Sequence, residues 1–465
     1  MRTSPISKFA PALLAYVVAA GLLPAADSDD LAQLREQLHS LEQKILMLER
    51  KQEIKDEADA VAAKAAPKIA VGDRGVTLAS GDGANSPRIR GLVQFDNRLF
   101  FADDGIANNS FLLRRARIIA EGSFSKNTTF QIVPEFGGGN AAGTTTPSIL
   151  DANIGITLTP ELQFKFGKFK SPVGLELLQS DSWTFFDERS LVTNLVPNRD
   201  VGAQASGDLL GGKLNYAAGV FGGVADGASS GNADFDNDKD GIVRLFATPF
   251  KGETDSALSG VSFGVSGSYG REKTASGRTS GYRTDGQQTF FSYLTTTIAD
   301  GHSSRISPQL DYRAGPFGLI GEFVRSTVQV RPSATGAKKT LANTAWQVGA
   351  GYVLTGEDSS FNGVVPRRNF NWANRTWGAV EVVARYADLK VDDAAFPLYA
   401  ATAGNADEAR AFGVGFNWYL NKVVRVSVDF YDTHFDLPPG APAVPTVPVL
   451  KQNEESLISR VQISF

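Results

Sequence analysis

The stretch SLISRVQISF, residues 456–465, ends the chain and decides the fold that the sequence predicts. Side chains alternate along it between an apolar and a mostly polar face. The apolar face holds Leu457, Val461, Ile463 and Phe465, and the other holds Ile458, Arg460, Gln462 and Ser464. This period of two predicts a β-strand with one apolar face. No later residue covers its edge, so we expect the first strand of a closed barrel to pair with it. The alternative is an ordinary C-terminal strand of a β-sandwich.

The composition favours a large β-barrel over a bundle of membrane helices. The 465 residues include 47 glycines and 30 phenylalanines, which suit many short strands and turns. A mean hydropathy of -0.14 is far too polar for a bundle of membrane helices and is typical of a barrel whose lumen is wet. The chain has no cysteine, which excludes disulfides, thiolate catalysis and cysteine metal sites.

The charge balance gives no reason to expect a nucleic-acid partner. The formal net charge is -4, and it becomes -6 when two cations, Arg2 and Lys8, leave with a signal peptide. These cations precede an apolar run and then Ala25 and Ala26, which predicts a secretory signal over residues 1–26. We expect any basic function to be local.

Residues 27–66 read as a short periplasmic coiled coil followed by a frayed alanine-rich linker. Apolar residues step by three and four through three heptads at Leu31, Leu34, Leu38, Leu41, Ile45 and Leu48. Three heptads are marginal alone, so other copies of the chain would supply the partner helices. The alternative is a single amphipathic helix lying on the membrane or the barrel. Residues 67–85 are expected to be a linker.

From residue 86 to residue 465 the pattern predicts an antiparallel barrel of sixteen transmembrane strands. In Arg88–Phe101, for example, apolar residues such as Val93 and Phe95 alternate with polar ones such as Gln94 and Asp96. The expected strands are 88–101, 111–125, 127–137, 149–158, 161–169, 199–208, 211–223, 240–249, 258–271, 302–314, 316–330, 341–355, 375–390, 407–420, 422–435 and 452–465.

The connections between these strands alternate between tight turns and long polar loops, as periplasmic turns and external loops do in outer-membrane barrels. The long connection at 356–376 falls on the periplasmic side, as an exception. Residues 287–300 look like a strand but would spoil the even count, so we assign them to an external hairpin.

Several motifs in this order resemble the phosphate-selective porin O and P family over about residues 86–465. They are FLLRRARIIAEG (111–122), FGKFKSPVGLE (166–176), TFFDERS (184–190), SPQLDYRAGPFGLIGEF (307–323), LTGE (354–357) and NWYL (417–420). The resemblance implies a sixteen-stranded homotrimeric porin whose third loop folds inward, with arginines along the anion path. Members often carry an N-terminal coiled coil. The terminal Phe465 likewise resembles the sorting signal that the barrel-insertion machinery reads in outer-membrane barrels.

The third external connection, Lys170–Asn198, is the candidate constriction loop. It is long, and its aromatic residues could anchor it against the barrel wall so that it narrows the lumen. The residues singled out are Lys170, Trp183, Phe185, Phe186, Asp187, Glu188 and Arg189.

Arginines on the second strand are the candidate anion-binding groups. Arg115 and Arg117 share one face, and Leu112, Ala116 and Ile118 form the other. An arginine in mid-bilayer is costly, so the arginine face should line the lumen, where guanidinium forks can bind phosphate oxygens. Arg114 has the wrong parity and is expected near the upper rim or on a bulge. By the resemblance, Arg114 and Arg115 align with the narrow anion site.

The expected anion-path residues of the lumen are Arg88, Arg90, Arg98, Arg114, Arg115, Arg117 and Lys165. The alternative is that they form lumen salt bridges with carboxylates such as Asp96 and Glu121. Strictly phosphate-selective relatives carry lysines in the inward loop, whereas LLQSDSW, residues 177–183, has none and offers Asp181. This departure puts phosphate specificity in doubt.

No cofactor and no catalytic site are expected. Asp236, Asp238 and Asp240 spell the first half of a calcium loop, but position twelve is Ala247 and not glutamate, which excludes an EF-hand. A loose external calcium site and a solvated acidic loop remain the two readings. The three histidines are scattered, so an enzyme is not expected.

The first functional hypothesis is therefore passive diffusion of small inorganic anions, such as phosphate or pyrophosphate, through a water-filled channel in the bacterial outer membrane. Two others stay open: a general or cation-preferring pore, and a plugged structural protein tethered through its coiled coil.

Overall fold

The computed structural model describes residues 28–101, 107–138, 146–232, 236–253, 256–273, 281–442 and 453–465. The expected signal peptide, residues 1–26, lies outside them. The chain divides into two compact units, Met1–Ala66 and Pro67–Phe465.

The first unit contains one long helix, α1 (Ser28–Ala65), which begins with acidic residues Asp29 and Asp30 in its first turn. Carboxylates there interact favourably with the helix dipole. The six leucine and isoleucine residues of the expected heptads are all exposed, by 50% to 66%. No helix among the described residues is both long and apolar enough to span a bilayer.

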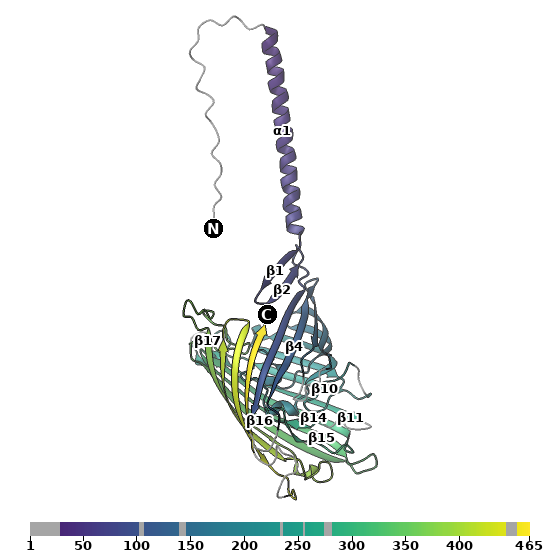
Figure 1. The fold of residues 1–465 in the computed structure, drawn as a ribbon. Helices are drawn as coiled ribbons and strands as arrows, with labels where there is room; N and C mark the ends of the chain where they lie inside the picture. Colours follow the sequence, from purple (N-terminus) through teal and green to yellow (C-terminus); the bar gives the residue numbers. More distant parts are fainter. Residues whose placement is uncertain are drawn as a thin grey trace. The chain divides into compact units, whose positions relative to one another are not determined.

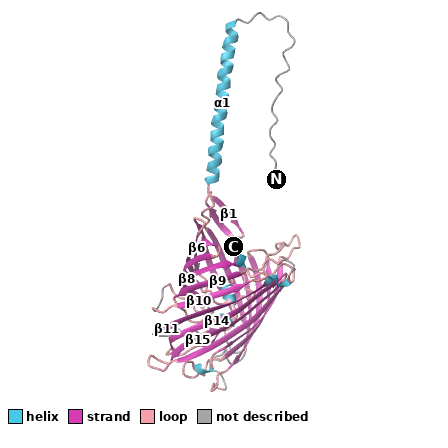
Figure 2. Ribbon diagram, turned by 180° about the vertical axis from the view of Figure 1, so that it is seen from behind, coloured by secondary structure: helices cyan, strands magenta, loops and turns pink. Residues whose placement is uncertain are grey.

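The second unit is a closed antiparallel barrel (Figures 1 and 2). Within the described residues, sixteen strands form its wall, which confirms the predicted number and order. They are β3 (Arg88–Phe100), β4 (Ser110–Phe124), β5 (Thr128–Glu135), β6 (Ser148–Thr159), β7 (Leu162–Lys170), β8 (Arg199–Leu209), β9 (Leu214–Phe221), β10 (Asp240–Ala247), β11 (Val261–Lys273), β14 (Ile298–Ala314), β15 (Phe317–Arg331), β16 (Lys339–Val353), β17 (Ala379–Lys390), β18 (Glu408–Tyr419), β19 (Val424–Asp436) and β20 (Glu454–Ser464).

The last strand closes the barrel on the first. β20 pairs with β3 from Ser456 opposite Phe100 to Ser464 opposite Leu92, and Figure 1 shows the yellow strand beside the dark blue ones. Phe465 extends the ladder, since it exchanges backbone hydrogen bonds of 2.9 and 3.1 Å with Gly91. A Cβ at position 91 would come within 2.6 Å of the Phe465 ring, so any larger residue there would displace that ring. The predicted closure is confirmed.

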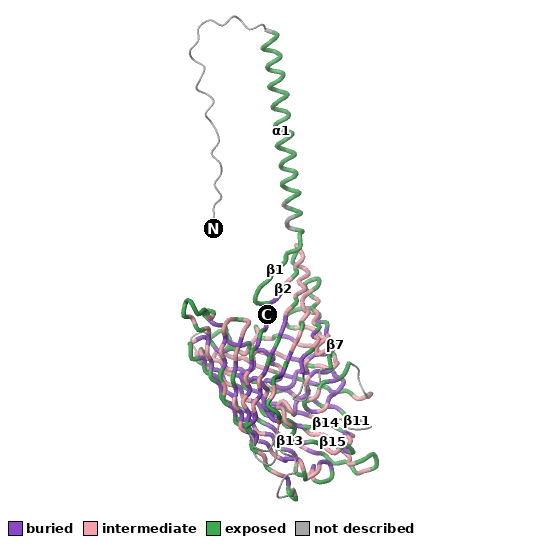
Figure 3. The backbone as a smooth tube through the Cα atoms, in the orientation of Figure 1, coloured by how far each residue is buried: buried purple, intermediate pink, exposed green. Residues whose placement is uncertain are grey.

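Burial alternates along the strands as the period of two predicts (Figure 3). In β20, Val461 and Ile463 are exposed on the outer face, whereas Arg460 and Gln462 are buried in the lumen. The outer face suits lipid, and the inner face carries the polar groups.

Two expectations about the connections are corrected. Residues 67–85 were expected to be a linker, but they form a hairpin of β1 (Lys68–Gly72) and β2 (Gly75–Ala79), whose Val76 and Thr77 pair with the start of β3. The residues 287–300 contribute β13 (Thr289–Phe291) and the start of β14. β13 pairs with β12 (Tyr282–Arg283) in a hairpin that is buried instead of external. The long connection between β16 and β17 lies, as expected, at the end of the barrel with the short turns.

Candidate permeation site

The lumen is organised by loop L3, residues 171–198, which joins β7 to β8 and contains α2 (Leu175–Leu178) and the 3-10 helix η1 (Leu191–Leu195). Phe185 and Phe186 are buried in a cluster with Ile320, Val383, Tyr431 and Ile458, residues of β15, β17, β19 and β20. Trp183 packs on a second cluster at the end of the barrel with the short turns. The loop therefore crosses the lumen to the opposite wall, as its aromatic residues predicted.

Polar contacts fix the start of L3. Lys170 Nζ donates to the carbonyls of Leu177 and Gln179, each at 2.7 Å. On the far wall, the Glu322 carboxylate accepts the backbone N–H groups of Leu175 and Glu176 at 2.8 and 3.1 Å. These are orphan donors at the start of α2, which a carboxylate satisfies well. The two motifs 166–176 and 307–323 thus meet in space.

Glu188 of L3 is held by three arginines from the barrel wall. Arg114 binds it through two hydrogen bonds, of 2.6 and 2.9 Å. Arg98 donates at 2.6 Å and Arg460 at 3.2 Å. Burial would raise the pKa of Glu188, but the surrounding guanidinium groups, Arg114 foremost, hold it well below its usual range. Its carboxylate is therefore ionised and clamps the loop to the first and last strands.

Asp181 is the second anionic centre of L3. Arg117 and Arg189 both contact it closely, while Arg115 and Arg199 lie at 3.7 and 3.9 Å. Burial opposes ionisation of Asp181, yet these cations keep its pKa well below the usual range. Segment 177–183, which has no lysine, thus places the Asp181 carboxylate among the wall arginines.

A β-bulge explains why Arg114 and Arg115 both face the lumen. The pairing of β3 and β4 skips Arg114, since Gln94 lies opposite Arg115 and Phe95 opposite Leu113. The expected bulge is therefore present. It also reverses the parity above it, so Leu112, expected on the lipid side, is buried inside at 8% exposure.

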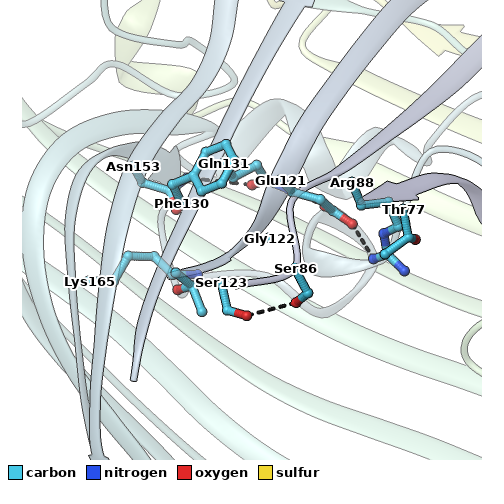
Figure 4. Close-up of a pocket in the computed structure, with 11 residues that line it drawn as sticks. Thr77, Ser86, Arg88, Glu121, Gly122, Ser123, Phe130, Gln131, Asn153 and Lys165 are labelled. Atoms are coloured by element: carbon cyan, nitrogen blue, oxygen red, sulfur yellow. Dashed lines mark hydrogen bonds and ion pairs between the residues drawn. The ribbon is translucent and has the colours of Figure 1, made fainter. Parts of the chain in front are cut away.

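The remaining predicted cations lie on the same wall, and all the predicted arginines are paired. Arg88 binds Glu121 (Figure 4). Arg90 binds the same carboxylate through two hydrogen bonds of 2.8 and 3.1 Å. Arg98 binds Asp96 at 3.0 Å besides Glu188. Lys165 lies within 4 Å of no carboxylate in the described part of the chain. The predicted arginines therefore form salt bridges in the lumen, as the alternative hypothesis for these residues stated.

Three buried lumen arginines are not among the predicted anion-path residues. Arg385 of β17 donates to Asp285 at 2.6 Å and to Glu176 at 3.2 Å, and its guanidinium lies 4.4 Å from the centre of the Phe186 ring. Arg425 and Arg460 are likewise buried, on β19 and β20. The period of two had already placed Arg460 on the polar face of its strand, and the same parity would have found Arg385 and Arg425.

A second loop also enters the lumen. Loop L5, of which residues 281–297 are described, carries the β12–β13 hairpin, whose Tyr282, Phe290 and Phe291 are buried. Glu454 accepts from Thr284 Oγ1 at 2.8 Å and from the Gly286 N–H at 3.1 Å. The aromatic residues of this segment were the signal for burial, which the external assignment overlooked.

Three hollows follow the wall from β3 to β10. The mouth hollow, about 460 Å³, includes Arg88, Glu121 and Lys165 (Figure 4). The central hollow, about 570 Å³, lies against L3 and includes Lys165, Arg199 and Arg244. The upper hollow, about 400 Å³, includes Arg114, Arg115 and Arg283. Together, eleven cationic side chains line the three hollows against five carboxylates.

The acidic calcium candidate does not gather into a cluster. The Asp236 carboxylate accepts the N–H of Asp238 at 3.0 Å, whereas Asp240 is buried in the lumen with an oxygen 3.6 Å from Arg305. Among the described residues no group of three or more His, Cys, Asp or Glu side chains could hold a metal ion.

Comparison with known proteins points to one class of membrane protein. The model of the family described as phosphate-selective porin O and P matches residues 88–437. The chain is 23% identical to Porin O of Pseudomonas aeruginosa over 392 residues, which cover 78% of this chain and 86% of that protein.

Solved outer-membrane channels have the same fold. DcaP of Acinetobacter baumannii matches with a TM-score of 0.50 and 11% identity over 83% of this chain and 98% of its own. OmpT of Vibrio cholerae, folded in vitro, matches with a TM-score of 0.50 and 12% identity over 82% and 98%. At these identities the likeness is one of fold alone.

Proposed function

Since the chain belongs to the phosphate-selective porin O and P family and is an outer-membrane diffusion channel, we propose that its pore prefers small inorganic anions such as phosphate or pyrophosphate. Transport is passive and follows the gradient. Catalysis is not expected of such a channel.

One observation carries the proposal: the three hollows along the β3–β10 wall hold eleven cations and five carboxylates. Nine of the eleven cations stand on strands β3 to β10, and Arg189 and Arg283 come from the loops L3 and L5. In a lumen partly filled by protein, Coulomb attraction is less screened than in bulk water. The net charge of -4 for the whole chain therefore does not determine the charge along the permeation path. Each paired arginine also retains N–H donors for a passing anion.

The test is the zero-current potential of the purified protein in a planar bilayer under a KCl gradient. An anion-preferring pore gives a potential of the sign set by chloride, and inorganic phosphate lowers the chloride current. The opposite sign would identify a cation-preferring pore and refute the proposal.

A plugged barrel is the second candidate, and a specific observation favours it. Besides L3, the L5 hairpin fills part of the lumen, and the β16–β17 connection folds onto L3, where the Phe361 carbonyl accepts from Gln179 at 2.8 Å. If the purified protein gives no stepwise increase in current when it is added to the planar bilayer, this second candidate is supported.

We further propose a homotrimer in which the N-terminal helices form a periplasmic coiled coil and the outer apolar band contacts outer-membrane lipid. The exposed heptad residues of α1 support this assembly, because a seam of leucines is covered when helices pair. Deletion of residues 28–65 is expected to lower the thermal dissociation temperature of the trimer while leaving conductance steps intact. An unchanged temperature would contradict it.

A further inference from the structure

Arg199 is a buried cation whose hydrogen bonding is incomplete. It begins β8, and its side chain is 7% exposed. One terminal nitrogen donates to the Asn198 side chain at 3.1 Å, but Nε is buried and makes no hydrogen bond with the described residues. The nearest carboxylates, Asp151 and Asp181, lie at 3.5 and 3.9 Å. This donor is available to a water molecule or a solute that enters the lumen.

Two further cations of the central hollow lack a carboxylate partner within 4 Å among the described residues. Lys165 has its ammonium group 5.3 Å from the centre of the Phe169 ring. Arg244 donates from Nε to Gln309 at 3.1 Å and lies 4.3 Å from the centre of the Phe246 ring. The hollow therefore offers two cationic groups with no carboxylate within 4 Å in the described part of the chain, besides Arg199 with its incomplete hydrogen bonding, and this positive charge favours an anion in the hollow.

The same hollow has an apolar side. Trp183 of L3 and Phe361 of the β16–β17 connection both line it, and both are half-buried. Its volume of about 570 Å³ is in the range of small-molecule pockets, roughly 300–1,000 Å³. Inorganic phosphate would use the cations and leave the aromatic surface unused.

We infer that the central hollow binds organic anions, with the carboxylate or phosphate group at Arg199 and the apolar body against Trp183 and Phe361. This inference rests on the proposed anion preference and extends it from inorganic to organic solutes. Aromatic rings stack on one another at a gain beyond area burial, so an aryl anion should bind more tightly than a bare one.

The probes are phenyl phosphate and inorganic phosphate, each titrated against the chloride current of the full chain in planar bilayers. In the wild type, phenyl phosphate is expected to half-block the current at a concentration about tenfold lower than inorganic phosphate, the effect of roughly 1.4 kcal/mol. Arg199→Gln should raise the half-blocking concentrations of both probes. Trp183→Leu should bring their ratio toward one. Arg410→Gln, a change at an exposed pair outside the hollow, is the matched control.

The results distinguish the organic-anion site from the proposed anion preference of the pore. Equal block by both probes in an anion-preferring wild type would overturn the organic-anion site alone. A cation-preferring wild type would refute the proposed function as well. Unchanged block in Arg199→Gln would remove the site from the central hollow. Because Trp183 also anchors L3, Phe361→Leu provides the same test of the ratio if Trp183→Leu does not assemble.

Discussion

Replacing Glu188 by glutamine should loosen the clamp that holds L3 in the lumen. The carboxylate is buried, at 2% exposure, and binds Arg98, Arg114 and Arg460 at 2.6 to 3.2 Å. Glutamine keeps the size of the side chain but removes its charge, so the buried Arg98 and Arg460 and the half-buried Arg114 lose their common ionic partner. Breaking a buried ion pair by removing one charge costs about 3–5 kcal/mol. We expect the free energy of unfolding to fall by that amount.

The assay is denaturant unfolding of the detergent-solubilised barrel, followed by tryptophan fluorescence. Glu161→Gln, a change at an exposed turn, is the control and should stay within about 0.5 kcal/mol of the wild type. If Glu188→Gln unfolds at the same denaturant concentration as the control, the carboxylate does not clamp the loop and the reasoning from the ion pairs is wrong.

Three other predictions concern acid, charge and assembly. Glu188 has a folded-state pKa well below its unfolded value of about 4.3, so the stability it contributes is complete above that value and is lost as the pH falls through the folded pKa. The difference in unfolding free energy between wild type and Glu188→Gln should therefore be constant from pH 7 to pH 5 and shrink below about pH 4. A difference that disappears above pH 5 would contradict this sign. The double change Arg115→Ala and Arg117→Ala should move the zero-current potential toward cations, because it removes two lumen cations and leaves Asp181 with fewer partners; an unchanged potential would take both arginines out of the path. Deletion of Phe465 should lower the heat-modifiable folded form while export continues, since the closing hydrogen bonds to Gly91 are lost; a normal trimer yield would count against the signal.

The strands of the barrel wall could be predicted from sequence because successive side chains alternate between the lipid and the lumen. Lipid outside and polar groups inside impose a period of two, and this local pattern gave all sixteen strands and the inward side of Arg460 and Gln462. The wrong parity of Arg114 could be seen for the same reason; it predicted either an upper-rim position or a bulge, and the structure has the bulge. The hairpin at 68–79 was missed because its two strands are only five residues long and it pairs with only the first two residues of β3, although Ile69 and Val71 lie opposite Leu78 and Val76 on one apolar face.

The lumen, by contrast, was decided by tertiary structure. Parity says that a side chain points inward but not which partner it meets, and Glu188 meets arginines that lie 74, 90 and 272 residues away in sequence. The course of a loop is likewise free of strand periodicity, so the burial of the L5 hairpin depends on contacts with Glu454 and Arg385 across the lumen. The sequence by itself determined a closed barrel with charged residues inside it. Which charged residues form ion pairs was decided by the closed barrel. The partners come from distant parts of the sequence, and a local sequence pattern does not say how far apart they lie across the lumen.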